Sequence, residues 1–160
     1  MQSTPRFSEM LYQRPSIDEI KRDSEALLQA WDAAGTVDAQ RAVIQQWDAS
    51  NVEYESNHML ARVTFQQKTQ DVAAKKEQEF FDDLNPLILE NSLAFLRRVT
   101  SSPNRDQLEQ SFGKQAFALW DCFLGTFSPE IADGNRTEAK LRTEYSQLRA
   151  SLEIEFNGTT

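Results

Sequence analysis

The side chains that could carry chemistry in this 160-residue chain are a single histidine, a single cysteine and several clustered carboxylates. Glu55 and His58 form a Glu-x-x-His pair, the pattern by which bundle helices supply ligands to a di-iron centre. Such a centre needs a second pair of this kind, and the chain holds no other histidine. We therefore interpret His58 as a core or boundary side chain that is hydrogen-bonded within the seam of its helix.

The only cysteine, Cys122, could act as a nucleophile with His58 as its base, because such partners need to be adjacent only in space. The local sequence does not support this pair, since no neighbouring lysine or arginine would favour the thiolate. Cys122 lies at the edge of the apolar half of a predicted helix, so we expect a small buried hydrophobe at this position.

A run of carboxylates between residues 77 and 83 is the third candidate, and it contains Glu77, Glu79, Asp82 and Asp83. Glu79 and Asp82 are three residues apart on one side of a helix, a geometry that could hold a cation. A charge run beside Lys75 and Lys76 is more typical of a solvated helix face, which is our interpretation.

Aromatic residues and motifs add no stronger site. Trp31, Trp47 and Trp120 could line a ligand groove, but their helical spacing favours core packing. The sequence has no Gly-rich phosphate loop, no Cys-x-x-Cys and no His-Glu-x-x-His motif. We therefore assign no catalytic, cofactor-binding or metal-ligating residue to this chain.

Charge and composition exclude several classes of protein. Acidic residues outnumber basic ones 25 to 17, giving a net charge of -8, which argues against a nucleic-acid partner. No apolar run approaches the roughly 20 residues that span a bilayer. One cysteine forms no internal disulfide, and the first residues do not resemble a secretory signal. These features predict a cytoplasmic protein with no membrane segment.

The elements that must position these residues are helices. Apolar residues recur at spacings of three and four through most of the chain, which predicts an all-α, elongated bundle of about five helices. We expect helices from the Ser16 capping box to Gly35, from about 37 to 67, from about 70 to 100, from the loop at 101–104 to about 127, and from about 135 to 151.

Two of these helices carry further expectations. Pro86 lies inside the third helix, where it should cause a kink or a fresh start because it lacks an amide donor. The fourth helix has a broad apolar half, so we predict that it is the central packing helix. That half contains Leu108, Phe112, Ala116, Phe117, Leu119, Trp120, Phe123, Leu124 and Phe127.

The last residues change period. Leu152, Ile154 and Phe156 alternate with polar residues and precede Asn157-Gly158, which predicts a strand followed by a hairpin turn. The predicted organisation is an arm at 1–15, a helical domain at 16–151, and the first strand and turn of a hairpin at 152–160. Because the second strand is absent, we expect that Thr160 is not the natural end and that a downstream domain completes the hairpin.

Several stretches, taken in order, resemble one known family. These are "YQRPSIDEIKRDSEALLQAW", "QEFFDDLNPLI", "SSPNRDQLEQSFGKQAFAL", "TFSPEI" and "EYSQLRASLEIEFNG". Together they resemble the N-terminal region of the oligoendopeptidase F family, the thimet-type zinc metallopeptidases. Single pieces are unspecific, whereas their order and spacing over nearly the whole chain are fairly specific.

The resemblance implies a cytoplasmic enzyme that cuts oligopeptides in a channel between two helical halves. It also implies that this segment forms part of the channel wall, and that the partners are oligopeptide substrates and the chain's own downstream catalytic domain. The family's zinc ligands and catalytic glutamate lie far downstream, so none is carried over to this segment. The alternative is a freestanding helical interaction module, a truncated or split relative that docks onto a partner.

Overall fold

The protein is built from helices, and the computed structural model describes residues 10–126 and 132–152. Within these ranges there are six helices and no strand. The helices are α1 (Ile17–Ala33), α2 (Val37–Gln67), α3 (Val72–Thr100), α4 (Arg105–Phe112), α5 (Lys114–Thr126) and α6 (Ala132–Ala150). The predicted all-α class is confirmed. The predicted strand and turn fall, apart from Leu152, outside the described residues.

Side-chain caps explain why the first three helices begin where the sequence predicts. Ser16 accepts from the amide of Glu19 at 3.4 Å, and Thr36 accepts from the amide of Ala39 at 3.2 Å. Asp71 accepts from Ala74 at 2.9 Å, and this hydrogen bond lowers the pKa of the Asp71 carboxyl. Each cap satisfies an amide that the first helical turn leaves without a partner.

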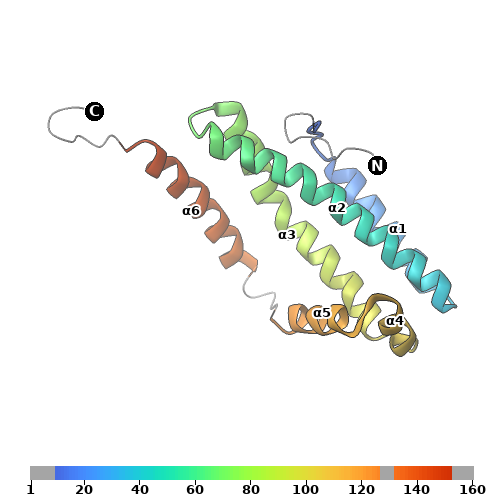
Figure 1. The fold of residues 1–160 in the computed structure, drawn as a ribbon. Helices are drawn as coiled ribbons and strands as arrows, with labels where there is room; N and C mark the ends of the chain where they lie inside the picture. The colour runs from blue at the N-terminus through green and yellow to red at the C-terminus, as the bar shows by residue number, and fades with distance from the viewer. Residues whose placement is uncertain (1–9, 127–131, 153–160) are drawn as a thin grey trace, which may run out of the picture.

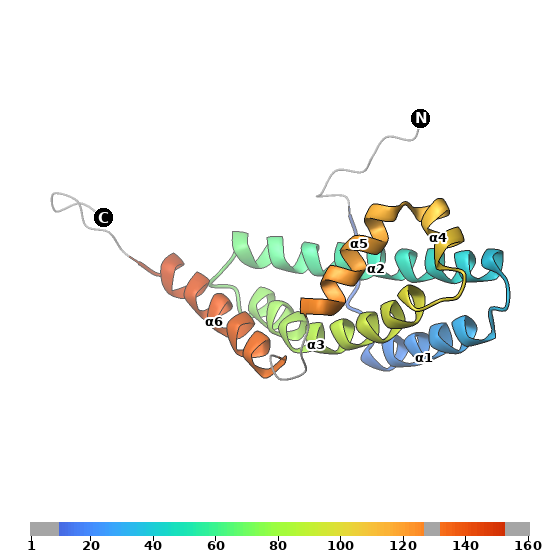
Figure 2. The same cartoon turned by 90° about the horizontal axis from the view of Figure 1, so that it is seen from below.

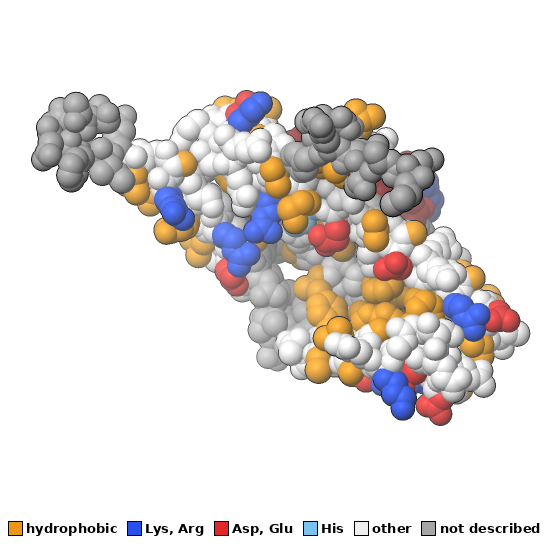
Figure 3. Space-filling view, in the orientation of Figure 1, with side chains coloured by type: hydrophobic (Ala, Val, Ile, Leu, Met, Phe, Trp, Pro, Cys, Tyr) orange, Lys and Arg blue, Asp and Glu red, His pale blue; other side chains and the backbone are white. Residues whose placement is uncertain are grey.

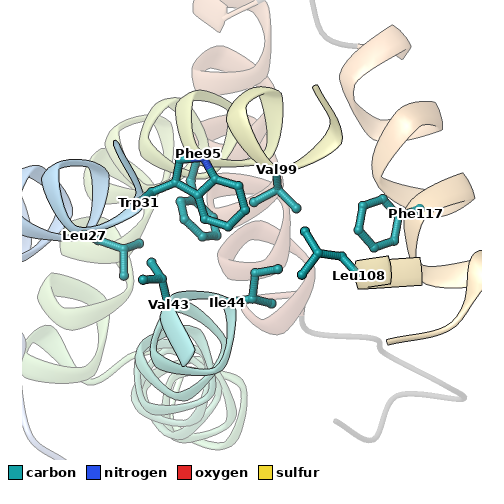
Figure 4. Packing of buried hydrophobic residues seen from close by; sticks show 8 residues of the cluster. All are labelled: Leu27, Trp31, Val43, Ile44, Phe95, Val99, Leu108 and Phe117. Atoms are coloured by element: carbon teal, nitrogen blue, oxygen red, sulfur yellow. The ribbon is translucent and has the colours of Figure 1, made fainter. Parts of the chain in front are cut away.

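Helices α1, α2 and α3 form the body of the molecule. In Figures 1 and 2, α2 and α3 run alongside each other, and α1 packs against both. Figure 4 shows the main core, to which five helices contribute buried side chains. Its members are Leu27, Trp31, Val43, Ile44, Phe95, Val99, Leu108 and Phe117. A second cluster, formed by Tyr54, Ala61, Phe81 and Leu84, lies between α2 and α3.

The helix α3 runs through Pro86 without interruption, so the predicted fresh start is wrong. Proline removes one backbone donor, but buried residues flank it on both sides: Leu84 is 3% exposed and Leu93 is 1% exposed. Packing on both flanks stabilises helical geometry across the missing hydrogen bond. This helix, which contacts α1, α2, α5 and α6, occupies the centre of the fold.

The predicted fourth helix is two helices, which corrects both the helix count and the proposed central role. Gly113 has a φ of 92°, a conformation that only glycine adopts readily, and it separates α4 from α5. The break changes the phase of the apolar stripe. Leu108 and Phe117 are fully buried, whereas Leu119 is 62% exposed and Phe123 is 39% exposed.

Arg105 holds the two short helices together across this break. Its guanidinium binds Glu109 at 2.7 Å and Asp121 at 2.6 Å, and it lies 5.3 Å from the centre of the Phe117 ring. The two carboxylates raise the pKa of Arg105 further above its ordinary value. One side chain of α4 therefore fixes the orientation of α5.

Candidate functional site

His58 is a boundary residue of α2. Its side chain is 18% exposed, and its ring stacks on Phe81 with 5.0 Å between ring centres. The nearest acidic atom is Oε2 of Glu55, 3.8 Å from Nδ1, which is longer than a hydrogen bond. The boundary location is as predicted, while the expected hydrogen bond is absent from the contacts of the described residues.

The described residues do not contain a metal centre. No group of three or more His, Cys, Asp or Glu side chains comes together in residues 10–126 and 132–152. A zinc or di-iron site needs at least such a group, so the donors present in the described chain do not fit either metal.

Cys122 is exposed on α5, which corrects the expectation of a buried thiol. The physical reason is the break at Gly113, after which Phe117 points into the core. Cys122 follows Phe117 by five residues, or about 140° around the helix, and so faces away from that contact. In the described part of the chain, no hydrogen bond joins Cys122 to His58.

The carboxylate run is dispersed by the fold. Glu79 pairs with Lys75 at 3.7 Å and Asp83 pairs with Lys140 at 3.4 Å, both at the solvated surface that the sequence predicts. Glu77 faces the arm that precedes α1. Asp82 is 6% exposed, so the interpretation of the whole run as a solvated face is wrong for this residue.

Asp82 is the centre of a buried polar network between α3 and α6. Nε2 of Gln78 donates to one carboxylate oxygen at 2.8 Å, and the hydroxyl of Thr143 donates to the other at 2.8 Å. Gln78 is 7% exposed, and its Oε1 atom is buried without a partner. These polar contacts attach α6 to the body of the molecule. Thr143 is 61 residues away from Asp82, and no pattern in the sequence predicts that the two residues meet.

The arm at residues 10–15 crosses α2 and α3, a contact that sequence reasoning missed. The amide of Gln13 donates to Asn57 of α2 at 2.8 Å. The hydroxyl of Tyr12 donates to Glu77 of α3, and Arg14 pairs with the same carboxylate at 3.3 Å. Partial burial and the neighbouring Glu77 raise the pKa of Tyr12. A residue that precedes proline favours extended backbone, as at Arg14-Pro15, but this local preference does not determine where the arm docks.

The tryptophans pack in and beside the core, as their spacing predicts. Trp31 and Trp47 both contact Phe95, with ring centres 5.6 Å and 5.3 Å apart, and Trp47 also contacts Trp120 at 6.1 Å. Trp47 additionally lines a cleft of about 350 Å³ between the arm, α1, α2 and α3. Of the three tryptophans, Trp47 lies among the residues that line this cleft, while the ligand groove stays a hypothesis.

The cleft has an apolar floor and an acidic rim. Leu27, Ile88 and Phe95 lie among its apolar lining residues. Glu19, Asp23 and Glu53 supply negative charge, while Arg14, the one cation among the described lining residues, is paired with Glu77. Figure 3 shows a second apolar region, where hydrophobic side chains gather between α2 and α5. Neither feature contains a group of three or more metal-ligating side chains among the described residues.

None of the helices in the described residues combines the length and apolar character needed to cross a membrane. The comparison with curated proteins found no match.

Comparisons with a protein-family model and with solved structures did find matches. The model of the peptidase M3 N-terminal domain matches residues 7–127. A crystal structure described as an oligoendopeptidase F from Bacillus anthracis strain Ames is 34% identical, with a TM-score of 0.88. It covers 95% of this chain and 28% of its own.

Two further solved structures match to the same extent. One is described as an oligoendopeptidase F, with 33% identity, a TM-score of 0.90, and coverage of 98% of this chain and 28% of that one. The other, PZ peptidase A with an inhibitor, has 33% identity, a TM-score of 0.90, and coverage of 96% and 27%. The chain therefore spans little more than a quarter of the solved chains that it matches.

Proposed function

Since the chain belongs to the peptidase M3 family as its N-terminal domain, we propose that it forms part of the substrate-channel wall of an oligopeptide-cleaving enzyme. The observation that carries this proposal is the identity of 33–34% to oligoendopeptidase F structures and PZ peptidase A over nearly the whole chain. In this proposal the segment shapes access of peptides to the reaction and supplies no catalytic group.

The surface most suited to a wall is the one seen in Figure 3. Leu119 and Phe123 of α5 are exposed although they are apolar. In Figure 3, hydrophobic side chains gather between α5 and α2. An extended peptide has side chains of every type, and exposed apolar patches are common at surfaces that contact such ligands.

Zinc, the metal that the family resemblance implies, would be held outside the described residues. These residues bring together no set of three ligand-type side chains, and His58 is stacked on Phe81 instead of facing other donors. Zinc is the group that would activate water for hydrolysis in the full-length enzyme. The residues described here would bind and orient the peptide around that reaction.

The proposal is tested with two proteins. The first is residues 1–160 alone with added zinc, for which we expect no hydrolysis of a quenched fluorescent oligopeptide. The second is a chimera in which residues 1–160 replace the matched part of the Bacillus anthracis relative, for which we expect hydrolysis. Chelator-sensitive turnover by the segment alone, or a folded chimera without activity, would overturn the proposal.

A freestanding interaction module remains the second candidate, favoured by the exposed apolar side chains of α6. The coding sequence separates the two. A reading frame that continues past codon 160 to a His-Glu-x-x-His helix would support the channel-wall role. A stop codon at that point would support the interaction module.

A further inference from the structure

The helix α6 is amphipathic in the opposite sense from an ordinary surface helix, which turns its apolar stripe toward the core. Its apolar residues are outside: Leu141, Tyr145 and Leu148 are 57%, 63% and 64% exposed, and Leu152, just beyond its end, is 64% exposed. At about 100° per residue the three residues within the helix lie on one face, nearly opposite Thr143. We call these three residues, together with Leu152, the α6 stripe.

The side of α6 that faces the bundle is held by polar contacts. Thr143 binds the buried Asp82, Gln147 donates to the carbonyl of Thr69 at 3.4 Å, and Lys140 pairs with Asp83. Figures 1 and 2 both place α6 at one end of the molecule, with one side on α3 and the other facing outward. Its apolar side is thus available for a second contact.

We propose that the α6 stripe is the docking surface for the polypeptide that follows this segment in full-length members of the family. This inference rests on the proposed function. The occupant is argued from the comparisons. The matched structures include most of α6, because they cover 95–98% of this chain, yet this chain covers only 27–28% of theirs. Because the matching family model is that of an N-terminal domain, we infer that the remaining polypeptide of these relatives follows the helix that bears the stripe.

The size of the stripe favours a covalently linked occupant over a second copy of the chain. A stable dimer usually buries about 800 Å² per partner, from some 20–30 residues. The α6 stripe has three large side chains on the helix and a fourth, Leu152, just beyond its end. A linked segment needs less contact area, because linkage gives it a high effective concentration at the stripe.

Thiol labelling measures whether the stripe is covered. Cys122 is exposed and is first replaced by serine, so that a new cysteine is the only thiol of residues 1–160. Any cysteine in the relative's part of the chimera is replaced in the same way. Leu148→Cys then reports on the stripe. Arg142→Cys, about 100° or more away on the same helix, is the matched control. Both are compared in residues 1–160 alone and in the chimera with the Bacillus anthracis relative.

We expect the labelling rate at position 148 to fall about tenfold or more in the chimera, because thiol reactivity follows exposure, while position 142 is labelled at similar rates in both. An unchanged rate at position 148, or equal protection of both positions, would overturn the assignment. So would protection at position 148 in the segment alone that rises with protein concentration, because the occupant would then be a second copy.

Peptidase activity is measured on the same chimera, so the two proposals can fail separately. An active chimera with an accessible position 148 would disprove the docking surface and leave the channel-wall role standing. A folded, inactive chimera with a protected position 148 would disprove the channel-wall role and leave the docking surface standing. If the chimera does not fold, labelling at the equivalent α6 positions of the full-length Bacillus anthracis chain decides the matter, and an accessible stripe there overturns the inference.

Discussion

The hydroxyl of Thr143 in α6 donates a hydrogen bond to Oδ2 of Asp82 in α3 across 2.8 Å, and both residues are buried. This contact joins residues 61 positions apart. It places a carboxylate in the interior and supplies it with a donor from α6, a helix that contributes no described residue to either buried hydrophobic cluster. The position of α6 therefore depends on a polar contact that can be removed by a single substitution.

Thr143→Val replaces the donor by a methyl group of similar size and leaves one oxygen of the buried Asp82 unpaired. We expect the free energy of unfolding to fall by about 1–3 kcal/mol, the cost of an unsatisfied buried polar group. Urea denaturation measures the change, and hydrogen exchange should show faster exchange in α6. Ser146→Ala is the control, since its hydroxyl bonds only the carbonyl of Arg142 in the same helix. Equal losses in the two variants would contradict the role of Asp82.

Gly113→Ala tests the break between α4 and α5. The φ of 92° is strained for any residue with a side chain, so we expect a loss of about 1–3 kcal/mol in the free energy of unfolding. Gly125→Ala is the matched control, because Gly125 is helical and a Cβ there meets no atom within 4 Å. It should raise the same free energy by up to about 1 kcal/mol. Thermal denaturation that shows the same sign for both variants would disprove the explanation.

Leu108→Ala and Leu119→Ala test which side of the α4–α5 unit packs on the body. Leu108 is 0% exposed in the main core, and truncation should cost about 2–5 kcal/mol through lost burial and a cavity. Leu119 is 62% exposed, and its truncation should change the free energy of unfolding by no more than about 0.5 kcal/mol. Chemical denaturation of both variants gives the comparison. A similar loss in the free energy of unfolding for both variants would instead support the single amphipathic helix that the sequence predicts.

The environment of Tyr54 should make the free energy of unfolding depend on pH in the alkaline range. Burial, and then the charges of Glu55 and Asp82, raise the pKa of Tyr54 above its ordinary value of 10.0. Between the unfolded and the folded pKa, the folded chain holds a proton that the unfolded chain has lost. The stabilisation is therefore complete below about pH 10 and decreases above it, by about 1.4 kcal/mol per pH unit for one such group.

Tyr54→Phe removes this titration together with the 2.6 Å hydrogen bond from the hydroxyl to Asn85. We expect lower stability at neutral pH and a shallower decrease above about pH 10, measured by urea denaturation across that range. The ultraviolet absorbance of the phenolate in the folded protein provides an independent readout. An identical slope in both proteins would show that Tyr54 ionises with equal ease in the folded and unfolded chains.

Local signals account for what could be predicted. Ser16 and Thr100 bound helices that the sequence places correctly, because caps and apolar spacing act over only a few residues. The single α4–α5 helix was a wrong prediction. A helical-wheel projection assumes one continuous helix and does not include the backbone angle of Gly113. The break at Gly113 therefore changes the direction in which every later side chain points.

The candidate site was predicted less well, because its residues are brought together over long distances in sequence. His58 was correctly placed at a boundary, but its stacking on Phe81 depends on how α2 packs on α3. The sequence predicts that Asp82 belongs to a solvated charge run, whereas in the structure α6 covers it and Thr143 donates to its carboxylate. Cys122 was assigned to the wrong side of its helix because the prediction treated α4 and α5 as one continuous helix.

By itself, the sequence determined the helical class, the approximate bounds of α1, α2 and α3, and the resemblance to a peptidase family, since these depend on local spacing and on the order of short motifs. Only the tertiary structure decided that Asp82 is buried, that the arm docks on Glu77, and that the apolar stripe of α6 faces outward. These outcomes depend on which helices meet and at what rotation. That is a property of the whole packed chain, because each buried polar group or exposed apolar stripe is set by its neighbours in space.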